Sequence, residues 1–234
     1  MEKAAADRSY ARNFINDQCI ARVPPGSRAL PSYQGQGSGF YTWQFYLRAA
    51  LFNPDVLGII VEHFLDCYEE PLRAGLWQLC GVESASTPLL TGIALEAHRR
   101  GYDVPVFSIR KDRKTYGLMN WLEGRIVERP AMLIDDLTSE SHKTAYHAVH
   151  VLDDHGIPIV PEFYAVVFKS HNTYHWINVG RHRLLVVPMF DLNDFDLSVE
   201  EYHARSTRHA MAEEPAPANP EPAAYRPDAP FGVA

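Results

Sequence analysis

The spacing of apolar residues predicts a helix over residues 54–71. Asn53 and Pro54 provide a capping residue and a proline at the first helical position. After them, Val56 and Ile60 begin a series of apolar residues that recurs at helical spacing. One face of this helix is therefore apolar and is expected to pack against a core.

Strands and helices alternate along the rest of the central sequence. Short apolar runs predict buried strands, and runs with helical spacing that end at a glycine predict helices. The predicted strands cover residues 76–80, 104–109, 131–134, 159–168 and 184–187, and the further helices cover residues 88–100 and 142–155. This alternation predicts an α/β fold with a mainly parallel sheet flanked by helices. Ligands then bind at the carboxyl ends of the strands, which places the chemistry at residues 81–87, 110–117 and 135–143.

The two ends of the chain differ in composition from this centre. Residues 34–39 consist of Gly, Gln and Ser, which favour loops, so residues 1–39 are expected to be a loosely ordered N-terminal segment. The last part of the sequence is dominated by Ala, Pro and Glu and cannot bury enough apolar surface to fold. We therefore expect one α/β domain over residues 40–208, with a small N-terminal hood, and a disordered tail over residues 209–234.

Charge and cysteine content limit the partners and the location of the protein. The chain has 29 acidic and 22 basic residues, a net charge of −7, so no global field draws it to nucleic acid or to an anionic membrane. It has no apolar run of about 18 residues, and a soluble protein is expected. Cys19, Cys67 and Cys80 lack paired spacing, which favours a reducing cytoplasm. Cys67 and Cys80 stand among apolar residues and are expected to be buried.

Two adjacent carboxylates follow the predicted strand over residues 131–134. Asp135 and Asp136 place negative charge at the end of a buried strand, where either magnesium or ribose hydroxyls can use it. The hydroxyl residues that follow, and the backbone N–H groups at the next helix start, suit a phosphate. An alternative is that the two acids only begin a turn and cap the helix.

Several segments, taken together, resemble the type I phosphoribosyltransferases, most closely the orotate phosphoribosyltransferases. Residues 131–141 resemble the phosphoribosyl pyrophosphate signature of that family, residues 110–117 its mobile catalytic loop, and residues 81–88 its pyrophosphate loop. Residues 40–54 resemble its substrate-side strand and hood. These similarities occur in the same order and at compatible spacing, which is more specific than any one motif. Residues 110–117 alone would also fit a solvated charged loop.

The resemblance implies a role for each matching residue. Asp135 and Asp136 would hold the ribose hydroxyls and help to place Mg²⁺, the implied cofactor. Ser139 and Ser141 would take the 5-phosphate. The implied catalytic residues are Lys111, Lys114, Asp135 and Asp136. The implied substrate-binding residues are Glu83, Ser84, Ala85, Ser86, Arg110, Ser139, Glu140, Ser141 and His142, with Arg110, Lys111 and Lys114 meeting the pyrophosphate.

The activity implied by the resemblance is transfer of ribose 5-phosphate from phosphoribosyl pyrophosphate to a nitrogenous base, with an orotate-like acid as the expected base. The family also implies a homodimer in which the mobile loop of one subunit covers the site of the other. Cations that close over the leaving pyrophosphate would stabilise its charge.

Several positions depart from the family pattern. Ser141 stands where the phosphate loop has glycine, Ala85 replaces the lysine of the pyrophosphate loop, and Tyr116 replaces the histidine of the catalytic loop. The lysine of the substrate-side strand has no counterpart, Thr42 being nearest, and Glu140 adds a negative charge beside the expected phosphate. A second interpretation is therefore a catalytically weakened homologue that binds a nucleotide or sugar phosphate and acts as a regulatory protein.

Overall fold

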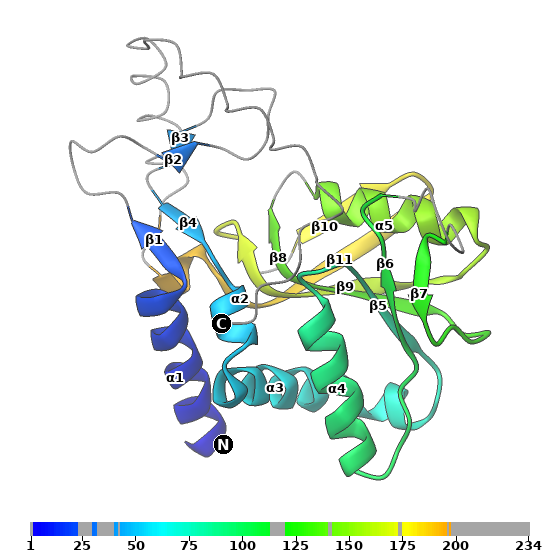
Figure 1. The fold of residues 1–234 in the computed structure, drawn as a ribbon, viewed down its shortest axis with the longest axis horizontal. Coiled ribbons are helices and arrows are strands. Elements are labelled where there is room, and N and C mark those ends of the chain that lie inside the picture. Colours follow the sequence, from blue (N-terminus) through cyan, green and yellow to red (C-terminus); the bar gives the residue numbers. More distant parts are fainter. Residues whose placement is uncertain are drawn as a thin grey trace, which may run out of the picture.

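A seven-stranded sheet forms the centre of the computed structural model, which describes residues 2–22, 30–31, 40–41, 43–112, 120–139, 142–172, 175–195 and 197 (Figure 1). The strand order is β10-β11-β9-β8-β5-β6-β7. The strands are β5 (Gln78–Val82), β6 (Val106–Ile109), β7 (Leu122–Gly124), β8 (Ala131–Ser139), β9 (Ile159–Lys169), β10 (His175–Val179) and β11 (His182–Asp191).

Parallel pairing joins all strands of this sheet except the two at its edges. β11 pairs with β9, β9 with β8, β8 with β5 and β5 with β6, each in parallel, whereas β10 and β7 are antiparallel to their neighbours. The predicted mainly parallel sheet is thus confirmed. Because parallel strands end at the same edge of a sheet, the segments that follow β5, β6 and β8 meet there. These segments contain the residues that the sequence predicts as a site.

Helices cover both faces of the sheet. α1 (Glu2–Gln18), α3 (Pro54–Arg73) and α4 (Thr87–Arg99) bury apolar side chains in one core cluster with strand residues such as Ile134. α5 (Lys143–Asp154) buries Ala145 and Val149 in a second cluster on the opposite face. Figure 1 shows α5 on one side of the sheet and the three other long helices on the other. None of the described helices is long and apolar enough to cross a membrane.

Shorter elements complete the described chain. β1 (Ile20–Arg22) pairs with β4 (Trp43–Phe45), and β2 (Leu30–Pro31) pairs with β3 (Phe40–Tyr41), both antiparallel. The short helix α2 (Arg48–Leu51) links β4 to α3, and the 3₁₀ helix η1 (Leu192–Phe195) follows β11.

The start of α3 confirms the capping prediction. The Asn53 side chain accepts hydrogen bonds from the backbone N–H groups of Asp55 and Val56, 3.0 and 3.1 Å long, and Pro54 opens the helix. Val56 and Ile60 are fully buried, as their helical spacing predicts. The helix therefore packs with the predicted face.

The prediction of a loosely ordered segment over residues 1–39 is wrong for Glu2–Gln18. This segment forms α1, which buries Ala11 and Ile15, and the Arg8 side chain donates a 2.8 Å hydrogen bond to the carbonyl oxygen of Met189. The buried face of α1 has few side chains, and that of Ala11 is only a methyl group. The apolar periodicity of this helix is therefore weak, although Ala11 and Ile15 are fully buried. The domain boundary at residue 208 and the tail over residues 209–234 lie outside the described residues and stay predictions.

Two further expectations are corrected by the structure. β8 continues five residues beyond Ile134, so Asp135 and Asp136 belong to the strand. Its ladder with β9 runs to Ser139, which is the partner of Lys169. Acidic residues are uncommon in strands, so the apolar pattern predicts a strand that ends before the observed one. Cys80 is buried as expected, but Cys67 is exposed because it lies on the outer face of α3.

Candidate functional site

The two adjacent carboxylates lie in β8, close to the edge where the parallel strands end. Asp135 is 3% exposed and Asp136 is 9% exposed. The Asp136 backbone N–H donates a hydrogen bond to Oδ1 of Asp135 over 2.9 Å. The predicted pair therefore forms one compact, acidic group that solvent barely reaches.

Burial raises the pKa of both carboxyl groups. For Asp135 the loss of solvation is the largest cause, and the neighbouring charge of Asp136 raises its pKa further, while Lys111 opposes the shift. Burial is also the largest cause for Asp136, and among the opposing effects is the charge of Arg48. Two like charges with so little water around them favour a bound cation or hydrogen-bond donors such as hydroxyl groups.

The end of β5 and the turn after it approach β8 very closely beside this pair. Gly81 leaves no room for a side chain, because a Cβ atom there would lie 2.5 Å from the Ser86 side chain and 2.6 Å from the carbonyl oxygen of Ile134. Glycine thus allows the β5 backbone to touch β8 just before Asp135. The Ser86 hydroxyl is fully buried and donates a 2.9 Å hydrogen bond to the carbonyl oxygen of Val82. Ser86 closes the turn inward, whereas Ser84 is exposed.

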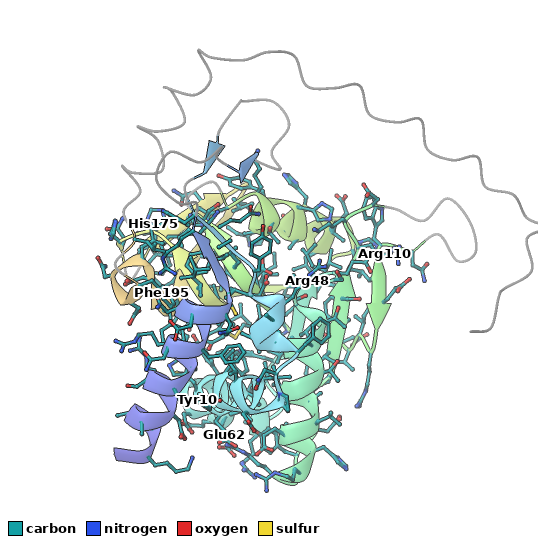
Figure 2. All side chains as sticks on the ribbon, turned by 60° about the vertical axis from the view of Figure 1, so that its left-hand side comes forward. Tyr10, Arg48, Glu62, Arg110, His175 and Phe195 are labelled. Atoms are coloured by element: carbon teal, nitrogen blue, oxygen red, sulfur yellow. The ribbon has the colours of Figure 1, made fainter. Side chains whose placement is uncertain are left out.

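Arg48 reaches this loop from α2, and sequence reasoning missed it. Its Nη2 atom donates a 3.0 Å hydrogen bond to Oγ of Ser84. Thirty-six residues separate the two positions, so no local motif joins them. In Figure 2, Arg110 is labelled higher and further to the right than Arg48.

Arg110 follows β6 and lies among carboxylates. Its guanidinium is 3.4 Å from a carboxylate oxygen of Glu83 and 3.0 Å from one of Glu123. Its backbone is held as well, since the carbonyl oxygen of Arg110 lies 2.7 Å from Nε2 of His147 on α5. Arg110 therefore joins the segments after β5 and β6, and part of its charge balances acids of the protein. Lys111, the next residue, is exposed.

The predicted phosphate segment begins at the end of β8. Ser139 is the last residue of the strand, and its carbonyl oxygen accepts a 2.9 Å hydrogen bond from the backbone N–H of His142. His142 is 4% exposed, has a φ of 44° and precedes α5. Its ring stacks on that of His175 with centroids 5.2 Å apart. His142 thus has the positive φ that glycine adopts most readily.

Lys169 is a second residue that the sequence did not single out. It ends β9 and is the ladder partner of Ser139. Burial lowers the pKa of its ammonium group. The only sequence signal is its place at the end of a strand predicted to be buried.

Of the predicted site residues, ten are described by the structure. β5, β6 and β8 with their following segments bring these ten to one edge of the sheet: Glu83, Ser84, Ala85, Ser86, Arg110, Lys111, Asp135, Asp136, Ser139 and His142. Lys114, Glu140 and Ser141 lie outside the described residues. The predicted roles of these residues stay predictions.

The donor set at Asp135 and Asp136 fits magnesium. Mg²⁺ prefers oxygen ligands and commonly takes one or two carboxylates together with phosphate oxygens of a substrate. The buried carboxyl pair supplies such oxygens. No group of three metal-ligating side chains occurs among the described residues, so a metal ion here would take further ligands from outside these residues.

A separate cleft of about 640 Å³ lies between α1, α3 and β11. Lys3 and Arg8 line it together with Asp7, Glu62 and Asp66, and burial lowers the pKa of His63 beside them, so the acids outnumber the cations by one. In Figure 2 Glu62 lies toward the bottom of the view, whereas Arg48 and Arg110 lie above it. None of the ten described site residues lines this cleft.

Comparison with known proteins identifies distant relatives of the chain. No family model matches it. It is 26% identical over 153 residues to the orotate phosphoribosyltransferase of Pyrococcus horikoshii, an alignment that covers 65% of this chain and 75% of the relative.

Solved structures resemble the fold over a larger part of the chain. A phosphoribosyltransferase from Corynebacterium diphtheriae superposes with a TM-score of 0.60 at 16% identity and covers 82% of this chain and 99% of that protein. The orotate phosphoribosyltransferase of Mycobacterium tuberculosis in complex with 5-phospho-α-D-ribosyl 1-diphosphate gives a TM-score of 0.56 at 18% identity, with coverage of 82% and 99%. At such identities these two likenesses establish the fold.

Proposed function

Because the chain is a distant relative of the orotate phosphoribosyltransferases and has the type I phosphoribosyltransferase fold, we propose that it transfers ribose 5-phosphate from phosphoribosyl pyrophosphate to a nitrogenous base. Orotate or a similar acid is the proposed acceptor. The reaction breaks the bond between C1 of the ribose and the pyrophosphate oxygen. A bond between C1 and a ring nitrogen of the base forms, pyrophosphate leaves, and the base loses its N–H proton.

The observation that carries this proposal is the buried pair of Asp135 and Asp136 inside β8. Burial raises the pKa of both carboxyl groups. The positive charge of Lys111 lowers the pKa of Asp135, and that of Arg48, from a different segment, lowers the pKa of Asp136. An anionic pair with cations on two sides suits a sugar whose hydroxyls need acceptors and whose pyrophosphate needs positive charge. A simple turn or helix cap would not require two acids to be buried inside a strand.

We assign the binding groups as follows. Asp135 and Asp136 accept hydrogen bonds from the two ribose hydroxyls and would hold magnesium, which when bound neutralises charge on the leaving pyrophosphate. Ser139 and Ser141, with nearby backbone N–H groups, take the 5-phosphate. Lys111 and Lys114 move toward the pyrophosphate when the loop over residues 110–117 closes. His142, whose ring stacks on that of His175, orients the segment.

A second candidate function is binding without turnover. Ala85 lies in the segment after β5 where the resembled family has lysine, and Tyr116 replaces the family's histidine. These changes remove charge and acid–base capacity from positions that stabilise the departing pyrophosphate. The same fold could then bind a nucleotide or sugar phosphate and regulate another protein.

A pyrophosphate-release assay separates the two functions. The protein is incubated with phosphoribosyl pyrophosphate, Mg²⁺ and one base at a time from a panel of pyrimidines and purines, and released pyrophosphate is measured. We expect release that depends on both the base and the metal, and that is lost in Asp136→Asn. Calorimetry with phosphoribosyl pyrophosphate on the same samples detects binding. Binding without release for any base supports the regulatory function, and absence of both contradicts the proposal.

We extend the proposal to a homodimer in a reducing cytoplasm. The segment over residues 110–117 is polar and long enough to reach a neighbouring subunit. All three cysteines are free thiols, which is compatible with a reducing compartment.

A further inference from the structure

The loop after β5 lacks a cation of its own. Its residues Glu83, Ser84, Ala85 and Ser86 carry one negative charge and no positive charge. Arg110 lies nearby, but its guanidinium contacts the carboxylates of Glu83 and Glu123. A pyrophosphate group placed at this loop would therefore meet little uncompensated positive charge from β5 or β6.

Arg48 brings positive charge to this place from a different part of the fold. Its guanidinium donates to the Ser84 hydroxyl over 3.0 Å, and its charge lowers the pKa of Asp136 against the effect of burial. Arg48 thus acts on both the loop and the acidic pair. An arginine in this position faces both parts of a substrate that joins a ribose to a pyrophosphate.

The position of Arg48 is fixed by the core. Leu47, Ala50 and Leu51 are buried on the inner side of α2, whereas Arg48 itself is exposed. The hydrogen bond from the Asn53 backbone N–H to the carbonyl oxygen of Ala50, 3.1 Å long, joins the end of α2 to the start of α3. Because the backbone is anchored on both sides, the guanidinium stays near Ser84 without being buried. Exposure keeps the cost of bringing it to an anionic ligand low.

We propose that Arg48 binds the pyrophosphate group of phosphoribosyl pyrophosphate and supplies the cation that Ala85 does not provide. This inference rests on the proposed function. A guanidinium offers five N–H donors in a planar fork that matches two phosphate oxygens. Among the described residues, its hydrogen bonding is limited to Ser84, so most of these donors face solvent. Arg48 binds pyrophosphate while Ser84 holds the fork in orientation.

Calorimetry with inorganic pyrophosphate and Mg²⁺ tests this role without requiring turnover. Arg48→Ala is expected to weaken pyrophosphate binding by roughly tenfold to a hundredfold, the effect of losing a charge-assisted hydrogen bond. Arg48→Lys should bind with intermediate affinity, because it keeps the charge but loses the fork. Arg12→Ala is the matched control, since it removes an exposed arginine of α1 and should leave the affinity unchanged.

A rescue variant separates direct binding from a structural role. Arg48→Ala combined with Ala85→Lys places a cation on the loop itself and should restore at least part of the lost affinity. A purely structural link between α2 and Ser84 would not be replaced in this way. Ribose 5-phosphate is the reference ligand, and its affinity should change much less than that of pyrophosphate, because it lacks the group that Arg48 is proposed to bind.

The outcomes distinguish this inference from the proposed function. The inference is overturned if the parent protein binds no pyrophosphate, if Arg48→Ala binds it as tightly as the parent, or if ribose 5-phosphate binding falls equally. The proposed function is judged separately by base-dependent release of pyrophosphate from the parent. If the parent releases pyrophosphate and Arg48→Ala binds pyrophosphate as tightly as the parent, the role of Arg48 is refuted and the transferase function stands.

Discussion

The backbone N–H of Asp136 donates a 2.9 Å hydrogen bond to the carboxylate of Asp135, and both side chains are buried within β8. This contact compensates only part of the cost of two neighbouring acids with little solvent. Their raised pKa values express the same cost, because burial disfavours the charged forms. The pair therefore costs stability at the place to which we assign binding of magnesium and of the ribose hydroxyls.

Replacing one acid of the pair should move stability and ligand binding in opposite directions. Asp135→Asn keeps the size of the side chain and removes one of the two charges. In metal-free buffer at neutral pH we expect a free energy of unfolding higher by about 1 kcal/mol or more, because a buried like-charge contact disappears. Binding of phosphoribosyl pyrophosphate with Mg²⁺ should weaken by at least about tenfold. Urea denaturation and calorimetry measure the two effects.

The sign of the pH dependence provides a control for Asp135→Asn. The pKa of Asp135 is raised in the folded protein, so the destabilisation is present at neutral pH and disappears as the pH falls and the carboxyl is protonated in both states. The stability advantage of the variant should shrink in acid. Asp66→Asn, which changes an exposed acid of α3, should show no such advantage. A destabilised Asp135→Asn protein with unchanged ligand affinity would contradict the assignment of the pair.

The sequence predicts the elements whose signals are local. Asn53 and Pro54 identify the start of α3, and the apolar run before Asp135 identifies β8. The nearness of the acidic pair to the segments after β5 and β6 also follows, because parallel strands end at one edge, although the pair lies inside β8 and not after it. The helix α1 was missed since its buried face rests on small or isolated side chains such as Ala11 and Ile15. Arg48 was missed because its contact with Ser84 depends on packing of distant elements.

A mixture of two inactive variants tests whether two subunits share a site. Lys114→Ala removes the cation predicted in the mobile loop, and Asp135→Asn removes the acid predicted to hold the ribose. If loops act across a homodimer, each hybrid dimer contains one site with neither substitution. The mixture, after subunit exchange, should then release pyrophosphate although neither variant does so alone. Activity that stays absent after verified exchange would show that each subunit uses its own loop.

Ion pairs between α3 and α4 should make stability depend on pH in acid. Glu96 on α4 accepts hydrogen bonds from Arg99 at 2.6 and 2.7 Å and from Arg100 at 2.9 Å. The hydrogen bonds with Arg99, more than any other favourable effect, lower its pKa from 4.5 to about 2. Arg100 also pairs with Glu69 on α3, with 2.9 Å between the charged atoms. This network therefore joins the two helices.

Glu96→Gln should lower the free energy of unfolding at neutral pH, where the parent carries the charge. Because the folded pKa is depressed, the stabilisation is complete above the unfolded value and is lost as the pH falls from 4.5 toward about 2. The difference between variant and parent should decline over this range, and it should also decrease with added salt. Glu128→Gln, a change at an exposed acid between β7 and β8, serves as the control in denaturant titrations. A difference that is constant with pH would exclude the ion pairs as its cause.

The backbone at His142 allows a test in which glycine and alanine should exchange their usual order. In a residue with helical φ, glycine is less stable than alanine by about 1 kcal/mol. His142 has a φ of 44°, a conformation in which a Cβ atom is disfavoured by about 1–2 kcal/mol. Both His142→Gly and His142→Ala lose the stacking on His175, so that loss cancels between them. His142→Gly should therefore be the more stable variant by about 1 kcal/mol in urea denaturation. If the alanine variant is the more stable one, the positive φ before α5 is absent in solution, and the segment after β8 has a different shape from the one to which we assign the 5-phosphate.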